Sequence, residues 1–70
     1  MTYSTDEIQP GWRVIDARGE ELGTVISVDS ETISIQRLSL MGGVWHAPTN
    51  AVREIETGRL ELSLRKEELT

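Results

Sequence analysis

The stretch Val14–Val25, which reads VIDARGEELGTV, decides the fold of this 70-residue chain. It places two apolar runs on either side of a polar connection, Ala17–Glu21, that contains Gly19. Because glycine readily adopts the positive φ angle of a tight turn, the pattern predicts a β-hairpin. Gly23 follows the first apolar residue of the second run and predicts a bulge that bends the returning strand. We therefore expect an all-β protein.

Apolar and polar residues alternate along most of the remaining chain, as they do in strands that bury one face. The expected strands are Trp12–Asp16, Leu22–Asp29, Thr32–Gln36, Val44–Ala47, Arg53–Glu56 and Arg59–Arg65. Pro48 has no N–H to donate to a neighbouring strand, so we expect a short helical turn near residues 49–52 after it. Short, evenly spaced strands predict a small antiparallel, strongly bent barrel of five or six strands that closes its own edges.

Length and composition indicate one domain over residues 1–70, with a core from about residue 8 to residue 65 and polar tails on either side. A chain this short buries only about 60% of the surface exposed by its unfolded form, so its core is marginal. Cysteine is absent, which excludes both disulfides and thiolate metal sites as sources of stability. Self-association or a larger assembly is the remaining source of stability.

The charge balance disfavours several classes of partner. Twelve acidic and seven basic residues give a net charge of −5, which repels a phosphate backbone, and the arginines are spread from Arg13 to Arg65. Nucleic acid is therefore disfavoured as a partner. No apolar run approaches the roughly 20 residues needed to cross a bilayer, and residues 1–7 lack the features of a signal peptide. We expect no membrane insertion and a cytoplasmic location.

Two motifs resemble those of PRC-barrel domains. The first is similar to the opening of these domains and reads Gly11-x-x-Val14-x-Asp16-x-x-Gly19-x-x-Leu22-Gly23-x-Val25-x-x-Val28. The second is similar to their proline-led turn before the last strands and reads Ala47-Pro48-x-x-x-Val52-x-x-Ile55. The resemblance extends from about Ile8 to Leu64 and is closest to small free-standing bacterial members of unknown function.

This resemblance implies a PRC-barrel-like fold and a protein-docking role without a catalytic centre. Members of the family include the cytoplasmic domain of the photosynthetic reaction-centre H subunit. Another is the C-terminal domain of the ribosome maturation factor that engages a ribosomal protein.

The chain contains little that points to catalysis or metal binding. His46 is the only histidine, no Gly-x-Ser-x-Gly motif activates a serine, and no cysteine accompanies the imidazole. Asp16, Glu20 and Glu21 cluster around one turn, but their spacing is not that of an EF-hand loop and suits a solvated turn. We predict no catalytic, metal or cofactor site and no enzyme activity.

The feature that points to function is an apolar group beside Gly42 and Gly43. Its members, the candidate protein interface, are Leu38, Leu40, Met41, Val44 and Trp45. Tryptophan and methionine are enriched in interface cores, so one interpretation is an exposed contact surface on a flexible hairpin. The other interpretation is that Leu38, Val44 and Trp45 fold back to plug one end of the barrel.

The leading hypothesis is a non-enzymatic protein-interaction or assembly module that self-associates or docks on a protein partner through this hairpin. An alternative is a domain that senses a small ligand or a metal ion through His46 and nearby carboxylates. A third, less favoured hypothesis is an RNA-associated factor whose arginines are gathered by folding.

Overall fold

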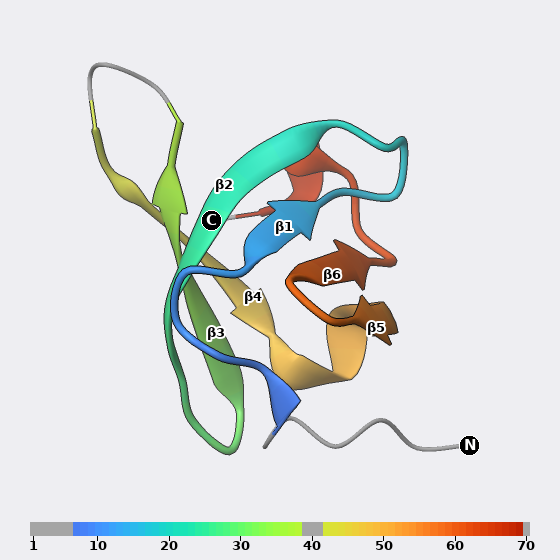
Figure 1. Ribbon diagram of the computed structural model, residues 1–70. Helices are drawn as coiled ribbons and strands as arrows, with labels where there is room; N and C mark the ends of the chain where they lie inside the picture. The colour runs from blue at the N-terminus through green and yellow to red at the C-terminus, as the bar shows by residue number, and fades with distance from the viewer. Residues whose placement is uncertain (1–6, 39–41, 70) are drawn as a thin grey trace.

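A computed structural model of the chain describes residues 7–38 and 42–69, which form a single curved sheet (Figure 1). Its six strands are β1 (Arg13–Ile15), β2 (Glu21–Val28), β3 (Thr32–Arg37), β4 (Val44–Pro48), β5 (Val52–Glu56) and β6 (Arg59–Leu62). Two short 3-10 turns, η2 (Thr49–Ala51) and η3 (Lys66–Glu68), follow β4 and β6. The all-β prediction is confirmed, and so is the helical turn after Pro48.

The order of the strands corrects two details of the expected barrel. The order is β4-β3-β2-β1-β6-β5, so the sheet formed by the described residues is open, with edges at β4 and β5. The pair β1–β6 is parallel, whereas the other four neighbouring pairs are antiparallel. Alternation in the sequence indicates which side chains face inward, but it carries no information on the order or direction in which distant strands pair. The predicted six-stranded, strongly bent all-β fold is therefore confirmed, whereas its closure and its wholly antiparallel pairing were wrong.

Strand β2 bends because its register with both neighbours shifts. Against β1, Ile15 lies opposite Glu21 and Val14 opposite Gly23, so Leu22 between them has no partner. A second register shift, between β2 and β3, leaves Ile26 without a partner on β3. These bulges increase the local twist and let β2 curve from one side of the sheet to the other. The bulge expected near Gly23 is thus present, one residue before it.

Gly23 is required by the close approach of β2 to β3. Its φ angle is +154°, and a Cβ built there would overlap the backbone oxygen of Gln36. Residues with a Cβ also avoid this region of φ. Gly23, which was expected to bend β2, therefore also allows β2 to approach β3 closely.

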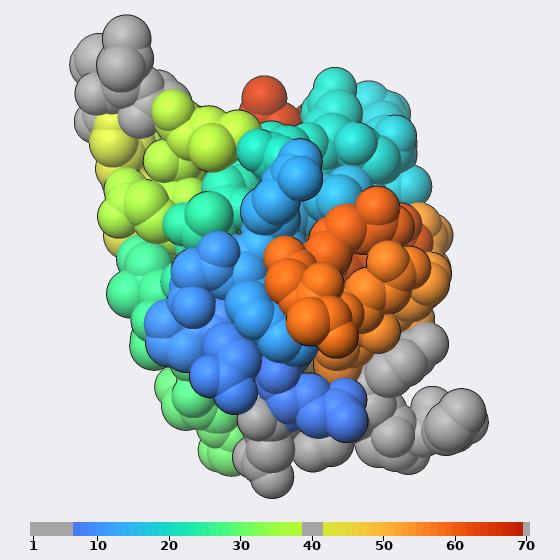
Figure 2. Space-filling model, in the orientation of Figure 1, coloured from blue at the N-terminus to red at the C-terminus, as the bar shows by residue number. Residues whose placement is uncertain are grey.

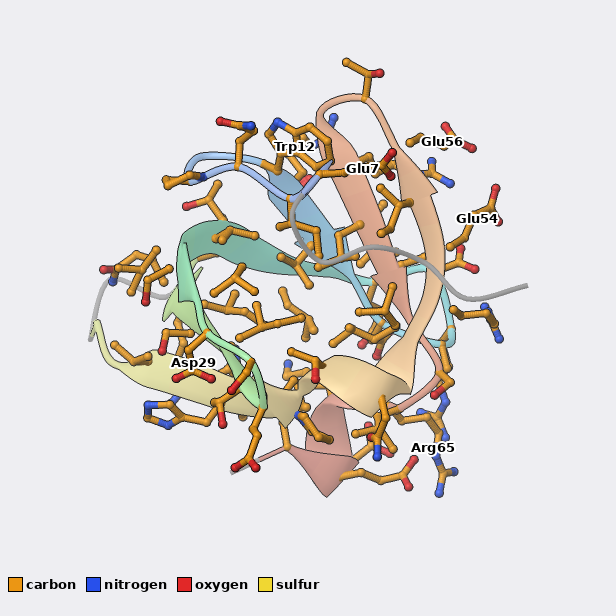
Figure 3. All side chains as sticks on the ribbon, turned by 90° about the horizontal axis from the view of Figure 1, so that it is seen from below. Glu7, Trp12, Asp29, Glu54, Glu56 and Arg65 are labelled. Carbon is orange, nitrogen blue, oxygen red and sulfur yellow. The ribbon has the colours of Figure 1, made fainter. Side chains whose placement is uncertain are left out.

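Apolar side chains fill the space that the curved sheet encloses (Figure 3). The core consists of Ile8, Val14, Leu22, Val25, Ile33, Ile35, Ala47, Leu60, Leu62 and Leu69. Leu60 and Leu62 are fully buried, as expected for alternate residues of the predicted strand Arg59–Arg65. The core also reaches past the predicted limit at residue 65, because η3 brings Leu69 back against the sheet and leaves it only 8% exposed.

Candidate functional site

The hairpin of β3 and β4 carries the described part of the predicted interface, and Figure 1 shows it reaching beyond the rest of the sheet. In its register, Trp45 lies opposite Ile35 and faces the core, while Val44 lies opposite Gln36 and faces the other way. The N–H of Arg37 donates to the carbonyl of Gly43 at 3.2 Å and ties the hairpin together near its end. The two faces of the hairpin therefore present different side chains.

A shallow pocket of about 90 Å³ lies at the base of this hairpin. We call its lining the hairpin-base surface, which consists of Glu21, Leu22, Arg37, Leu38, Trp45 and Lys66. Leu38 is 58% exposed, whereas Trp45 is half-buried and packs against the core. The guanidinium of Arg37 lies 4.3 Å from the centre of the Trp45 ring, within the range of a cation–π contact. The pocket thus joins apolar and cationic groups with one carboxylate, that of Glu21.

The structure separates the five residues of the predicted interface. Leu38 and Trp45 line the same pocket, but Val44 is 41% exposed on the opposite face of the sheet. Leu40 and Met41 lie outside the described residues. The plug interpretation fits the half-buried Trp45, whereas Leu38 and Val44 remain in contact with solvent. Figure 2 shows the described end of the β3–β4 hairpin, in yellow-green and yellow, on the upper left side of the molecule.

A buried carboxylate holds one wall of the pocket in place. Asp16 is fully buried just after β1, and its Oδ1 accepts the N–H groups of Arg18 and Glu20, both at 2.9 Å. Its Oδ2 accepts the N–H of Lys66 at 3.0 Å. Asp16 therefore connects the β1–β2 turn with the start of η3 and brings Lys66 to the pocket beside Glu21.

The same contacts determine the protonation state of Asp16. Burial raises the pKa of a carboxyl group because it disfavours the charged form. The three N–H hydrogen bonds, from Glu20, Lys66 and Arg18, together with the positive charge of Arg18, outweigh this effect and lower the pKa below its ordinary value of 3.8. The side chain is therefore ionised at neutral pH, and it acts as a structural acceptor whose oxygens are already engaged by N–H donors.

Four lining residues of the pocket were missed in the sequence. Arg37 precedes Leu38 directly, so its place next to the predicted interface was a signal that could have been used. Leu22 was assigned only to a strand, and Glu21 only to a solvated turn. Lys66 had no local signal, because it reaches the pocket through its contact with Asp16, which is distant in the sequence.

The alternative candidate residues lie apart from this pocket. His46 is exposed on β4, opposite Ser34, and within residues 7–38 and 42–69 no three His, Cys, Asp or Glu side chains are grouped to hold a metal ion. At another end of the molecule, Trp12 and Ile55 line a second open hollow with Glu7 and Glu56. Figure 3 shows the labelled Glu7 and Trp12 together there, with Arg65 at the opposite end.

Most of the positive charge is neutralised locally. Five of the six arginines lie within 4.0 Å of a glutamate, in the pairs Arg13–Glu21, Arg18–Glu67, Arg53–Glu61, Arg59–Glu61 and Arg65–Glu68. The sixth is Arg37, which stacks on Trp45 instead. Binding to a nucleic acid requires Lys and Arg side chains that replace the counterions of its phosphates. The ion pairs with glutamate leave fewer arginines available for this. Arg37 stands out as the arginine available at the pocket.

Over residues 8–70 the chain matches a family described as uncharacterized proteins conserved in bacteria, DUF2171. The chain belongs to the DUF2171 family. No curated protein and no solved structure matches it. In the part of this DUF2171 chain that the structure describes, no helix has the length and apolar character needed to cross a membrane.

Proposed function

We propose that this DUF2171 protein is a non-enzymatic protein-interaction module that binds its partner through the hairpin-base surface. The observation that carries the proposal is the 58% exposure of Leu38 beside the half-buried Trp45, on the rim of a shallow pocket. Tryptophan and arginine are the residues that most often dominate binding energy in protein interfaces, and here Arg37 stacks on Trp45. A loop that only connects two strands does not require Leu38, Trp45 and Arg37 to line one pocket.

The pocket chemistry indicates which partner side chains it favours. Its volume of about 90 Å³ suits one apolar side chain, placed against Leu22 and Leu38. Arg37 and Lys66 give the lining of the pocket two positive charges, against the one negative charge of Glu21, in a chain whose net charge is −5. A partner segment that carries an apolar residue next to a carboxylate therefore complements the surface in shape and charge.

The proposal is supported by the resemblance of the glycine and apolar spacings to PRC-barrel domains, whose members dock on other proteins. We propose a distant relationship to those domains and a cytoplasmic location. The small core, which relies on short strands and has no disulfide, also suits a protein that gains stability from a partner.

The test replaces Leu38 with aspartate and uses Ile26→Asp as its matched control. Both residues are exposed apolar side chains, at 58% and 42%, but Ile26 lies on β2, away from the pocket. Light scattering measures self-association from micromolar to millimolar concentration, and cross-linking in a bacterial lysate captures other partners. We expect association in the wild type and in Ile26→Asp, and its loss in Leu38→Asp. A wild-type protein that stays monomeric and captures nothing contradicts the proposal.

A further inference from the structure

Strand β4 is an edge of the sheet, and two backbone bonds show which of its groups face β3. The N–H of Arg37 donates to the carbonyl of Gly43 at 3.2 Å, and the N–H of Thr49 donates to the carbonyl of Glu31 at 2.9 Å. Hydrogen-bonded positions alternate along an antiparallel pair. With the observed register, the odd-numbered residues of β4 therefore bond to β3, and the even-numbered residues direct their backbone groups to the open side.

Val44 and His46 are the even-numbered residues with a free N–H, because Pro48 has none. Both are exposed, and within residues 7–38 and 42–69 no turn, loop or cap hydrogen bond uses their backbone groups. An edge strand with open N–H and carbonyl groups is a template for another strand. The open side of β4 thus offers the backbone groups that strand addition requires.

The two edges of the sheet differ in how well they are protected. No Asp, Glu, Lys or Arg occurs from Leu38 to Val52, and β4 lies within this stretch. The opposite edge, β5, carries Arg53, Glu54 and Glu56. Charged residues on an edge strand discourage pairing with another chain. The charged residues therefore discourage the addition of another strand at β5, whereas the uncharged β4 remains open to it.

We propose that the open side of β4 pairs antiparallel with β4 of a second copy of this chain, about a two-fold axis at Trp45. This inference rests on the proposed function, since self-association is one form of the protein contact proposed above. In this arrangement Val44 of one copy lies opposite His46 of the other, and each of the two symmetric pairs exchanges both of its backbone bonds. The two sheets then join into one.

Charge favours a second copy as the occupant. An uncharged strand approaches β4 without repulsion, and this chain itself supplies one. Arg37 stands near one end of β4, opposite Gly43, while Glu31 stands near the other, bonded to Thr49. Antiparallel pairing sets the cationic end of each copy beside the acidic end of its partner. The small core also favours pairing with a second copy, because a shared sheet stabilises both copies.

The direct test is amide hydrogen exchange of the wild-type chain at micromolar and millimolar concentration, followed by NMR. Trp45 and Ala47 bond to β3 in a single copy, so their amides are protected at both concentrations. We expect the amides of Val44 and His46 to exchange at least about tenfold more slowly at high concentration, because pairing then closes their open side. Equal exchange at both concentrations overturns the inference.

A pair of variants separates backbone pairing from side-chain contact. Val44→Pro removes the open N–H without touching a bond to β3, whereas Val44→Thr retains the N–H and the branched shape. At roughly two- to tenfold in affinity per hydrogen bond, loss of one donor in each copy weakens the dimer by about four- to a hundredfold. We expect this loss in Val44→Pro alone. The amide test on the wild type stands even where Val44→Pro fails to fold.

The outcomes distinguish this inference from the proposed function. A dimer that dissociates in Leu38→Asp, while Val44 and His46 exchange rapidly throughout, overturns edge pairing and keeps the hairpin-base surface as the interface. A dimer that dissociates in Val44→Pro but not in Leu38→Asp supports edge pairing and contradicts the role of the pocket in self-association.

Discussion

Replacement of Asp16 by asparagine tests how the β1–β2 hairpin is attached to the C-terminal turn. Asp16 is fully buried and accepts three backbone N–H groups, two on Oδ1 and one, from Lys66, on Oδ2. The asparagine side chain keeps one oxygen for Arg18 and Glu20. In place of the other oxygen it presents an NH₂ group, which faces the N–H of Lys66 and cannot accept from it.

The expected loss follows from the bonds that change. One charge-assisted hydrogen bond is lost, at roughly 1.5–3 kcal/mol, and the remaining two become weaker neutral bonds, so the sum is about 3 kcal/mol. A domain of this size has a free energy of unfolding of about 4–10 kcal/mol. We therefore expect the variant to lose about a third or more of its stability and to melt about 12–24 °C lower.

The assay is urea unfolding followed by tryptophan fluorescence, with thermal unfolding by circular dichroism as a second probe. Asp29→Asn is the matched control, because Asp29 also accepts two backbone N–H groups, from Glu31 and Thr32, but is exposed to solvent. We expect a clearly smaller loss in the control. Equal losses in the two variants, or no loss in Asp16→Asn, refute the reasoning from burial.

The same carboxylate makes stability depend on pH. The pKa of Asp16 in the folded chain lies below its ordinary value of 3.8, so the unfolded chain binds the proton at higher pH than the folded chain does. The stabilisation is therefore complete at neutral pH, starts to decline below about pH 4, and is lost as the pH falls through the folded value. Asp16→Asn removes this contribution, so its stability should fall less steeply with acid than that of the wild type.

Three further predictions follow from the fold and its charges. Gly23→Ala should lower the free energy of unfolding by about 3 kcal/mol or more, because the new Cβ overlaps the backbone oxygen of Gln36, whereas Gly19→Ala, in open space at φ +85°, should cost about 1 kcal/mol. Urea unfolding checks both, and similar losses would contradict the close approach of β2 and β3. Leu69→Ala should cost about 2 kcal/mol by the same assay, and an unchanged midpoint would show that this end does not pack on the core. An RNA column at low salt should not retain the protein, because five arginines are already paired with glutamates, and retention that weakens steeply with salt would refute this.

Local patterns in the sequence were sufficient for the approximate positions of the strands and for the buried face of β6. The alternation of Leu60 and Leu62 placed both in the core, and Gly23 marked the bend in β2. Both features depend on residues that are neighbours in the chain. The parallel pairing of β1 with β6 depends on the path of the whole chain, and alternation is the same whichever direction a neighbour runs.

The candidate site was only partly visible in the sequence for the same reason. Leu38 and Trp45 stood out because they are large apolar residues beside two glycines, and the structure brings them to one pocket. Val44 is separated from them because strand alternation turns it to the opposite face. Lys66 joins the pocket through Asp16, and no periodicity links two residues so far apart in the chain.

The most direct test of the account is the position of the backbone amide signals in NMR spectra of the isotope-labelled protein, recorded from micromolar to millimolar concentration. If the protein associates with itself through the β3–β4 hairpin, signals of Leu38, Val44, Trp45 and His46 shift with concentration while those of β5 remain fixed. Signals that do not move anywhere in this range, or that move on β5 instead, contradict self-association through this hairpin.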